Sequence, residues 1–169
     1  MDVITIEELL PEHFALVAAW LSKTDINRWL TAEWRNRAVS TTDLAIALRN
    51  PSNRLFLVRV NGQACGLTAL ADIEVADATA MIWYFLGDSA LSRRGIASEA
   101  VKQVVRKSFQ ELKLQSLYAW VMEDNLASAK LLRKVGFRKV GRIRQATSSN
   151  GRQVDRIYFD IVTGECLGV

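Results

Sequence analysis

Residues 86–100 read Leu-Gly-Asp-Ser-Ala-Leu-Ser-Arg-Arg-Gly-Ile-Ala-Ser-Glu-Ala, and this stretch decides the fold. A β-rich segment ends at its start, a basic loop containing Gly95 follows, and an amphipathic helical pattern begins near Ser98. The first turn of a helix has unpaired N–H groups and the positive end of the macrodipole, and Gly95 and Ala97 keep side-chain bulk away from them. The stretch therefore predicts an anion-binding turn, to which Arg93 and Arg94 add charge. A solvated surface turn is the alternative for this motif alone.

A second motif makes the anion-binding interpretation more specific. Asn125-Leu-Ala-Ser-Ala-Lys-Leu-Leu-Arg-Lys-Val-Gly-Phe137 lies between two short apolar segments. The two motifs in this order resemble the GNAT superfamily of acyl-CoA-dependent N-acyltransferases. The resemblance is good from about Leu55 to Asp160 and holds only in outline for the residues before. Residues 80–87, 97–101 and 131–137 look like the branch that acetylates ribosomal-protein amino termini, spermidine, aminoglycosides and nucleotide-linked amino sugars.

Hydrophobic periodicity predicts one mixed α/β (α+β) domain over the whole chain, residues 1–169, and the resemblance implies that this is a single N-acetyltransferase domain. Strands are expected at 3–6, 55–60, 63–70, 80–86, 117–122, 137–143 and 156–162, with helices near 11–21, 40–48, 98–112 and 127–134. Asn61-Gly62 predicts a tight hairpin, and short turns make the strands from 55 to 86 an antiparallel meander. The resemblance implies about four helices and a strongly twisted, mostly antiparallel sheet of six to seven strands, in which strands 80–86 and 117–122 splay into a V-shaped notch.

Composition limits the classes of function. The 169 residues carry 22 Lys and Arg against 18 Asp and Glu, a net charge of +4, which favours an anionic partner without proving one. Cys65 and Cys166 lack Cys-x-x-Cys spacing and His13 is the single histidine, so we expect no metal site. No apolar run approaches the length of a membrane span, and two isolated thiols suit a reducing compartment. We expect a cytoplasmic protein that binds neither membrane nor nucleic acid, as a monomer or homodimer.

The resemblance implies acetyl-CoA as the acyl donor and a main-chain-rich site for it. The pantetheine arm would pair with the strand ending at Phe85 and Leu86, as an added strand does. The pyrophosphate would lie on the loop and first helical turn, and further contacts would come from the second motif. The residues expected to hold the donor are Phe85, Leu86, Arg93, Arg94, Gly95, Ile96, Ala97, Ser98, Asn125 and Lys130.

Two positions depart from the family pattern. Ser92 stands where Gln or Arg is usual, which weakens one phosphate contact, and Leu132 replaces the tyrosine that often protonates the departing thiolate. Ser128 is the best remaining proton donor, although a first-turn Ser binding backbone is an equal alternative. Tyr84 and Tyr118 are further alternatives. An oxyanion donor is expected from the backbone near Phe85.

The acceptor amine must lose a proton, so a carboxylate is expected near the notch. Asp72 and Glu74 are the candidate bases, with surface carboxylates as the alternative for each. The acceptor pocket is expected between the 25–37 loop, the 72–77 turn and the 145–152 loop, with Trp29, Glu33, Trp34 and Tyr84 as candidate acceptor-binding residues. Neighbouring arginines, Arg28, Arg35 and Arg37, favour an acceptor bearing phosphate or carboxylate over a polycation.

These features predict an acetyl-CoA-dependent N-acetyltransferase acting on a primary amine of a small molecule or a protein amino terminus, by direct attack in a ternary complex. A catalytically inactive acyl-CoA sensor or partner-binding module is the main alternative, because Leu132 leaves the usual tyrosine position unfilled.

Overall fold

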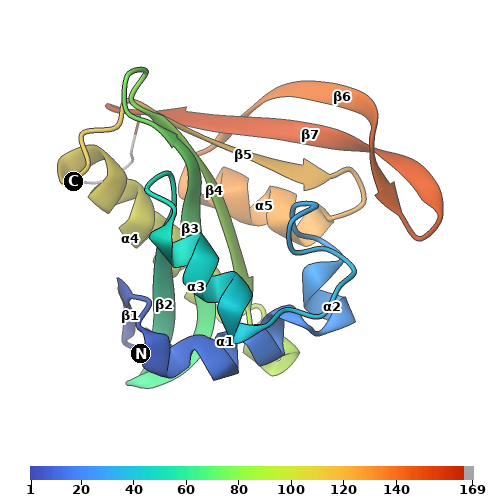
Figure 1. Cartoon of the computed structure of the whole chain (residues 1–169). Helices are drawn as coiled ribbons and strands as arrows, with labels where there is room; N and C mark the ends of the chain where they lie inside the picture. Colours follow the sequence, from blue (N-terminus) through green and yellow to red (C-terminus); the bar gives the residue numbers. More distant parts are fainter. Residues whose placement is uncertain (166–169) are drawn as a thin grey trace.

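The computed structural model describes residues 1–165, and it confirms an α+β fold built on one seven-stranded sheet (Figure 1). The strands are β1 (Ile4–Glu8), β2 (Arg54–Val60), β3 (Gln63–Glu74), β4 (Thr79–Leu86), β5 (Ser116–Met122), β6 (Arg138–Ser149) and β7 (Arg152–Val162). The helices are α1 (Phe14–Leu21), α2 (Thr24–Asn27), α3 (Thr41–Arg49), α4 (Ile96–Gln110) and α5 (Leu126–Val135), with 3₁₀ turns at Pro11–His13 and Ser89–Leu91. Cys166 lies outside the described residues.

The strand order β1-β2-β3-β4-β5-β7-β6 is antiparallel except between β4 and β5. The predicted meander from β2 to β4 is confirmed, and Asn61 and Gly62 both adopt the positive φ that a tight hairpin requires (50° and 82°). The parallel pair arises because α4 connects β4 to β5, and a crossover of that kind returns the chain in the same direction.

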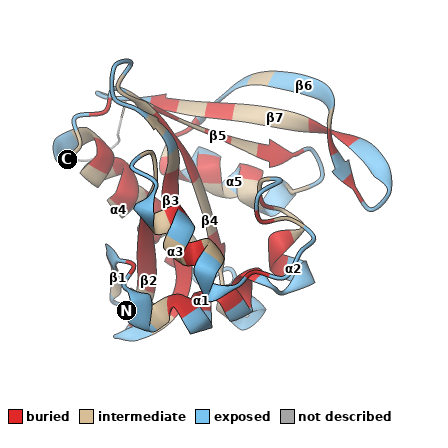
Figure 2. Ribbon diagram, viewed as in Figure 1, coloured by how far each residue is buried: buried red, intermediate tan, exposed pale blue. Residues whose placement is uncertain are grey.

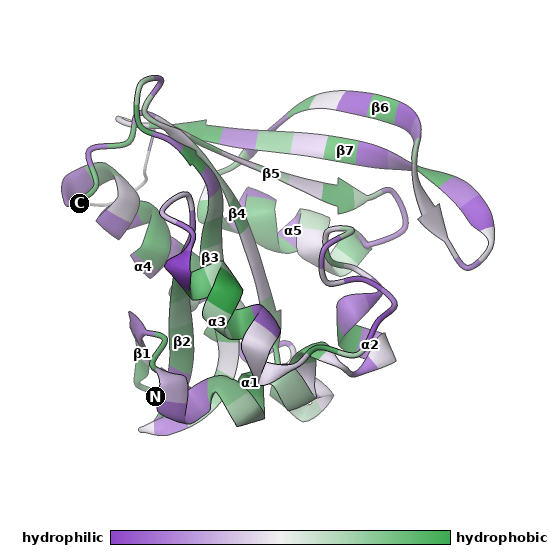
Figure 3. Ribbon diagram, viewed as in Figure 1, coloured by the Kyte–Doolittle hydropathy of each residue, from purple (hydrophilic) through white to green (hydrophobic). Residues whose placement is uncertain are grey.

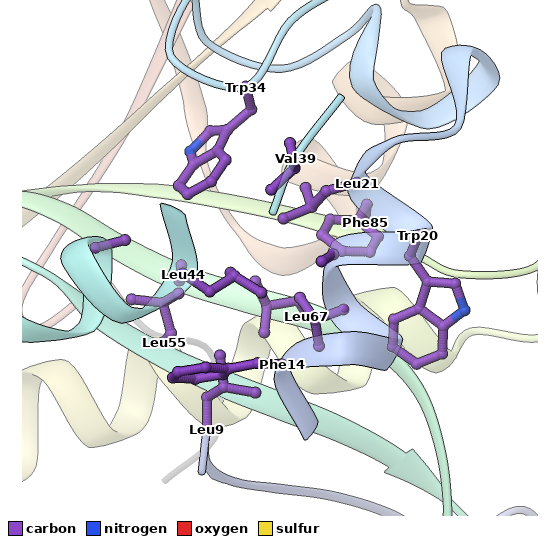
Figure 4. Packing of buried hydrophobic residues seen from close by; sticks show 14 of the residues in the cluster. Leu9, Phe14, Trp20, Leu21, Trp34, Val39, Leu44, Leu55, Leu67 and Phe85 are labelled. Atoms are coloured by element: carbon purple, nitrogen blue, oxygen red, sulfur yellow. The ribbon is translucent and has the colours of Figure 1, made fainter. Parts of the chain in front are cut away.

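Helices cover the two faces of the sheet separately. On one face, α1 to α3 pack over a cluster that includes Phe14, Leu21, Leu44 and Phe85 (Figure 4). On the other face, α4 and α5 pack against a second apolar cluster (Figure 2). Period-two alternation along β4 divides its side chains between the clusters: Trp83 and Phe85 join the first, and Ile82 and Tyr84 join the second.

The predicted notch between β4 and β5 is present. The two strands pair only where Thr79–Met81 meets Ser116–Tyr118, and beyond Met81 β4 has no partner on that side (Figure 1). The turn between β3 and β4 therefore lies at the paired end of the V. This corrects the expectation that the 72–77 turn flanks its open end.

Three further expectations need correction. A short helix, α2, interrupts the 25–37 segment that was expected to be an irregular loop. Helix α4 begins at Ile96, two residues before the expected start, because Gly95 at φ 81° ends the preceding loop. Residues 145–149 belong to β6, which is mostly exposed and largely hydrophilic, and a two-residue turn at Asn150-Gly151 replaces the expected loop (Figures 2 and 3).

Candidate functional site

A cavity of about 60 Å³ lies at the notch, and residues from both faces of the sheet line it. Its walls are formed by strands β4 and β5, by the 29–31 segment and by the first turns of α5. The lining residues are Trp29, Leu30, Thr31, Met81, Ile82, Trp83, Tyr84, Ala119, Trp120, Val121, Asn125, Ser128 and Leu132. Residues from the 29–31 segment and from α5 thus meet through the gap in the sheet, and none of the β6–β7 hairpin is among them.

The exposed edge of β4 presents main-chain groups to this cavity. Gly87 N–H donates to the Cys65 carbonyl at 2.8 Å, and the same register pairs Phe85 with Leu67. Hydrogen-bonded pairs alternate in an antiparallel ladder, so the main chain of Phe85 bonds to β3 and that of Tyr84 points away, toward the gap. The geometry moves the expected oxyanion donor from Phe85 to Tyr84, and the Phe85 ring is buried in the core.

The first turn of α4 has the geometry of an anion site. Gly95 is the N-cap, its φ is 81°, and no side chain caps the helix. The N–H groups of Ile96, Ala97 and Ser98 are therefore available to a ligand. A Cβ built on Gly95 meets no atom within 4 Å, so the glycine is required by its backbone conformation and leaves open space beside the turn.

The two arginines of the loop have different environments. Arg94 is held by Asp2, with donor–acceptor distances of 2.8 and 2.9 Å to its two carboxylate oxygens. Arg93 is exposed and has no ion-pair partner among residues 1–165. Arg93 and Arg94 were both expected to contact phosphate. Within the described chain, the charge of Arg94 is compensated by Asp2, whereas the charge of Arg93 is not.

The first turn of α5 brings two hydroxyl groups together at the cavity wall. Asn125 caps the helix, and its side-chain oxygen accepts the Ser128 N–H at 3.2 Å. Ser128 Oγ lies 2.7 Å from the Tyr84 hydroxyl. Burial raises the pKa of Tyr84 above its usual value, so the phenol stays protonated at neutral pH. Leu132 is fully buried, whereas Lys130 is exposed on the outer side of α5.

Glu33 lies in the segment between α2 and α3, Asp72 lies on β3, and the charges of these two carboxylates interact. Partial burial raises the pKa of Glu33 above its ordinary range, and the negative charge of Asp72 raises it further. Asp72 lies at a bulge of β3 with φ 50°. The pKa of Tyr118 is raised mainly by burial, and the negative charge of Asp72 raises it further. Glu33 and Asp72 therefore form a carboxylate pair in which Glu33 holds its proton more strongly than usual.

Other candidate residues lie in less reactive positions. Glu74 stabilises the turn between β3 and β4, where its carboxylate accepts the Ala76 N–H at 3.1 Å. Trp34 is 2% exposed and its ring centroid lies 5.8 Å from that of Trp83, so it is part of the core. Trp29 lines the cavity. Tyr84 was expected beside the acceptor, but its side chain lies on the α5 face.

The arginines expected near the acceptor have different partners. Arg37 pairs with Asp43 at 2.7 Å, and the guanidinium carbon of Arg28 lies 4.1 Å from the centre of the Trp29 ring. Arg35 approaches the Leu30 carbonyl at 3.5 Å, and burial lowers its pKa, with a further contribution from the charge of Arg156 on β7. No pattern in the sequence indicates a role for Arg156. Only the strand pairing brings it to this region.

Groups suited to metal binding are absent from residues 1–165, since no three His, Cys, Asp or Glu side chains cluster there. Within the same part of the chain, no helix has the length and apolarity needed to cross a bilayer.

Comparison with known proteins identifies the family. The family model described as acetyltransferase (GNAT) domain matches residues 4–138, and the chain therefore belongs to this family. The resemblance inferred from the two sequence motifs is confirmed.

Two curated bacterial relatives illustrate the similarity. The probable N-acetyltransferase YjcK of Bacillus subtilis (strain 168) is 48% identical over 73 residues, which cover 43% of this chain and 40% of that protein. The uncharacterized N-acetyltransferase p20 of Bacillus licheniformis is 30% identical over 124 residues, covering 73% and 69% of the two chains. The match to YjcK thus spans about two fifths of the length of that relative.

Solved structures share the fold. A spermidine N-acetyltransferase from Vibrio cholerae, in complex with CoA and spermine, superposes with a TM-score of 0.87 at 19% identity over 98% of each chain. RimL, a ribosomal L7/L12 alpha-N-protein acetyltransferase in complex with CoA, gives 0.83 at 17% identity over 94% of this chain and 93% of its own. At these identities the likeness establishes the fold alone.

Proposed function

We propose that this protein transfers the acetyl group of acetyl-CoA to a primary amine of a small molecule or a protein amino terminus, by direct attack in a ternary complex. The observation that carries the proposal is the cavity at the notch, which is lined both by residues of α5 and by the 29–31 segment. A thioester held in the gap can be reached by an amine from the opposite face without leaving the site.

The donor would be held mainly by main-chain groups. The pyrophosphate fits the uncapped first turn of α4, where the N–H groups of Ile96, Ala97 and Ser98 are free and Arg93 adds positive charge. The pantetheine arm would pair with the unpartnered edge of β4. The Tyr84 N–H would then face the thioester carbonyl and stabilise the oxyanion, and removing such a donor typically costs ~10²-fold or more in rate.

Proton transfer would use the two side-chain pairs. A carboxylate of the Glu33–Asp72 pair takes a proton from the attacking nitrogen as the C–N bond forms. When the C–S bond breaks, Ser128 donates its hydroxyl proton to the CoA sulfur and recovers one from Tyr84, which lies 2.7 Å away. Tyr84 regains its proton from solvent. This hydroxyl pair would supply the function that Leu132 cannot.

The first experiment measures acetyl-CoA binding by calorimetry and free-thiol release with spermidine, an aminoglycoside, amino-terminal peptides and nucleotide-linked amino sugars. Gly95→Glu should weaken binding by about 100-fold, because it adds a side chain and a negative charge beside the anion site. Gly151→Glu is the matched control: Gly151 also has positive φ and open space, but it lies in the β6–β7 turn.

The outcomes separate the two candidate functions. Thiol release above the amine-free background, abolished in Gly95→Glu and kept in Gly151→Glu, supports the transferase. Tight acetyl-CoA binding with no release from any amine favours the acyl-CoA sensor. Absence of acetyl-CoA binding contradicts both.

A further inference from the structure

Arg35 and Arg156 form a pair of half-buried arginines beside the notch. They come from different parts of the chain, Arg35 from the segment between α2 and α3 and Arg156 from β7. Arg35 approaches the carbonyl of Leu30, and Arg156 packs on Trp120. Leu30 and Trp120 both line the cavity, so each arginine contacts a residue of the cavity wall.

The guanidinium of Arg156 is fixed in place by two contacts. Its Nε donates to Thr147 Oγ1 at 2.5 Å, and Thr147 is 3% exposed. Its carbon lies 4.1 Å from the centre of the Trp120 ring. Stacking and the Nε bond leave both terminal nitrogens free, and two adjacent N–H donors in a plane match the geometry of a carboxylate or phosphate.

The charges of this arginine pair are not compensated within the described chain. Among residues 1–165, neither arginine has a carboxylate within ion-pair distance. The positive charge of Arg156 is close enough to contribute to the lowered pKa of Arg35. Holding two like charges together out of water is unfavourable, and an anion between them would reverse that cost.

The arginine pair is separate from the carboxylates that would receive the amine. The charges that shift the pKa of Glu33 are those of Asp72, Arg37 and Asp43. The charge that shifts the pKa of Arg35 is that of Arg156. The two carboxylates and the two arginines therefore lie in different charge environments.

From these contacts we infer that the acceptor is a bipolar molecule, whose amine lies at Glu33 and Asp72 and whose carboxylate or phosphate binds Arg35 and Arg156. The inference rests on the proposed function, because it names the substrate class of the same site. Arg35 and Arg156 are specificity-determining residues, and they take no part in the chemical step.

The test uses matched acceptors that differ in their anionic group. Glucosamine 6-phosphate is compared with glucosamine, threonine with threonine amide, and spermidine serves as the polycation. Binding of each to the full-length protein saturated with CoA is measured by calorimetry, and thiol release with acetyl-CoA is measured in parallel. The two pairs distinguish phosphate from carboxylate as the recognised group.

We expect the anionic member of at least one pair to bind at least 10-fold more tightly than its neutral partner. Arg156→Gln should abolish that difference by weakening the anionic member, with the neutral member unchanged. Lys139→Gln, which removes an exposed charge from the neighbouring strand β6, should preserve the difference. In a turnover assay, the Arg156 variant should raise KM for the anionic acceptor and leave kcat unchanged.

Equal binding of charged and neutral members in both pairs, or tighter binding of spermidine than of any anionic amine, overturns the inference. An equal loss for both members in Arg156→Gln overturns it as well. The proposed function is judged separately: release from spermidine alone keeps the transferase and contradicts the bipolar acceptor. Anion-dependent binding without any release supports the acceptor site and contradicts catalysis.

Discussion

The two sides of the β4–β5 notch are built from different kinds of groups. The side proposed to bind the donor consists of main-chain groups: the edge of β4, the uncapped turn at Gly95 and the N-cap of α5. The acceptor side consists of charged and aromatic side chains on segments far apart in sequence. Main-chain geometry tolerates substitution as long as the backbone path is kept, whereas recognition by side chains changes with each residue. Substitutions are therefore expected to alter acceptor recognition more readily than donor binding.

The largest expected effect is on the packing where β4 leaves the sheet. A Cβ at Gly87 would lie 2.3 to 2.5 Å from three atoms of the Trp20 ring, so Gly87→Ala must displace that indole from the core (Figure 4). We expect a loss of about 3 kcal/mol in the free energy of unfolding, measured by urea denaturation. Gly141→Ala, whose Cβ would meet nothing within 4 Å, is the control and should change stability little. Equal changes in the free energy of unfolding for the two variants would show that the backbone at Gly87 accommodates a side chain.

The next effect concerns the acceptor side. Glu33→Gln should lower kcat/KM about 100-fold, because general-base catalysis typically contributes ~10²-fold or more. The raised pKa of Glu33 places the acidic limb of the pH–rate profile above the usual range for a carboxylate, and the variant should lose this limb. Asp77→Asn removes an exposed carboxylate nearby and is expected to keep both rate and limb.

The same variant separates catalysis from stability. A carboxyl group whose pKa is raised on folding stabilises the protein at low pH, and that contribution is lost as the pH rises through the raised pKa. Glu33→Gln should therefore not lower the free energy of unfolding at neutral pH. A fall in stability that parallels the fall in rate would assign Glu33 a structural role.

A smaller effect is expected at the hydroxyl pair. Tyr84→Phe and Ser128→Ala should each lower kcat by about 10-fold with acetyl-CoA binding unchanged, since they act only when the thiolate departs. The double variant should lose little more than either single one, because the two hydroxyls form one proton path. Additive losses would mean that they act independently. Ser148→Ala, exposed on β6, is the control.

The smallest effect is at the start of α3, which packs on the acceptor side of the sheet. Ser40 and Asp43 form a capping box, and Ser40→Ala should cost about 1 kcal/mol of stability. The hydrogen bonds from Ser40 and the Arg37 guanidinium lower the pKa of Asp43 to about 2. The stability that this carboxylate contributes is present above its ordinary pKa and is lost as the pH falls toward 2. The melting temperatures of Ser40→Ala and of the unaltered protein are compared at pH 7 and at pH 2. The difference between the two proteins should be smaller at pH 2.

Local sequence signals predicted several turns and helix ends correctly. Gly95 and the basic loop before it marked the turn that leads into α4, Asn61-Gly62 marked a hairpin, and Gly136 was correctly expected to end α5 in a left-handed conformation. Each of these features depends on residues adjacent in the chain, which is why the sequence alone reveals them. The bounds of β6 and β7 were underestimated, because exposed polar strands have no apolar alternation to mark them.

The acceptor side was predicted only in part. Glu33 and Asp72 were named separately, but nothing in the sequence showed that they pair or that Trp34 is buried in the core. Glu74 looked equivalent to Asp72, and the bulge in β3 sends them to different environments. Arg156 carried no signal, since a basic residue on a strand is ordinary.

The sequence by itself determined the family, the order of the strands and of every helix except α2, and the glycine turn that leads into α4, because these follow from periodicity, turn chemistry and local motifs. Only the tertiary structure decided which main-chain groups of β4 face the gap, that Tyr84 meets Ser128, and that the charge of Arg156 acts on Arg35. The reason is that strand register and the divergence of β4 from β5 set these distances, and both depend on packing across the whole sheet.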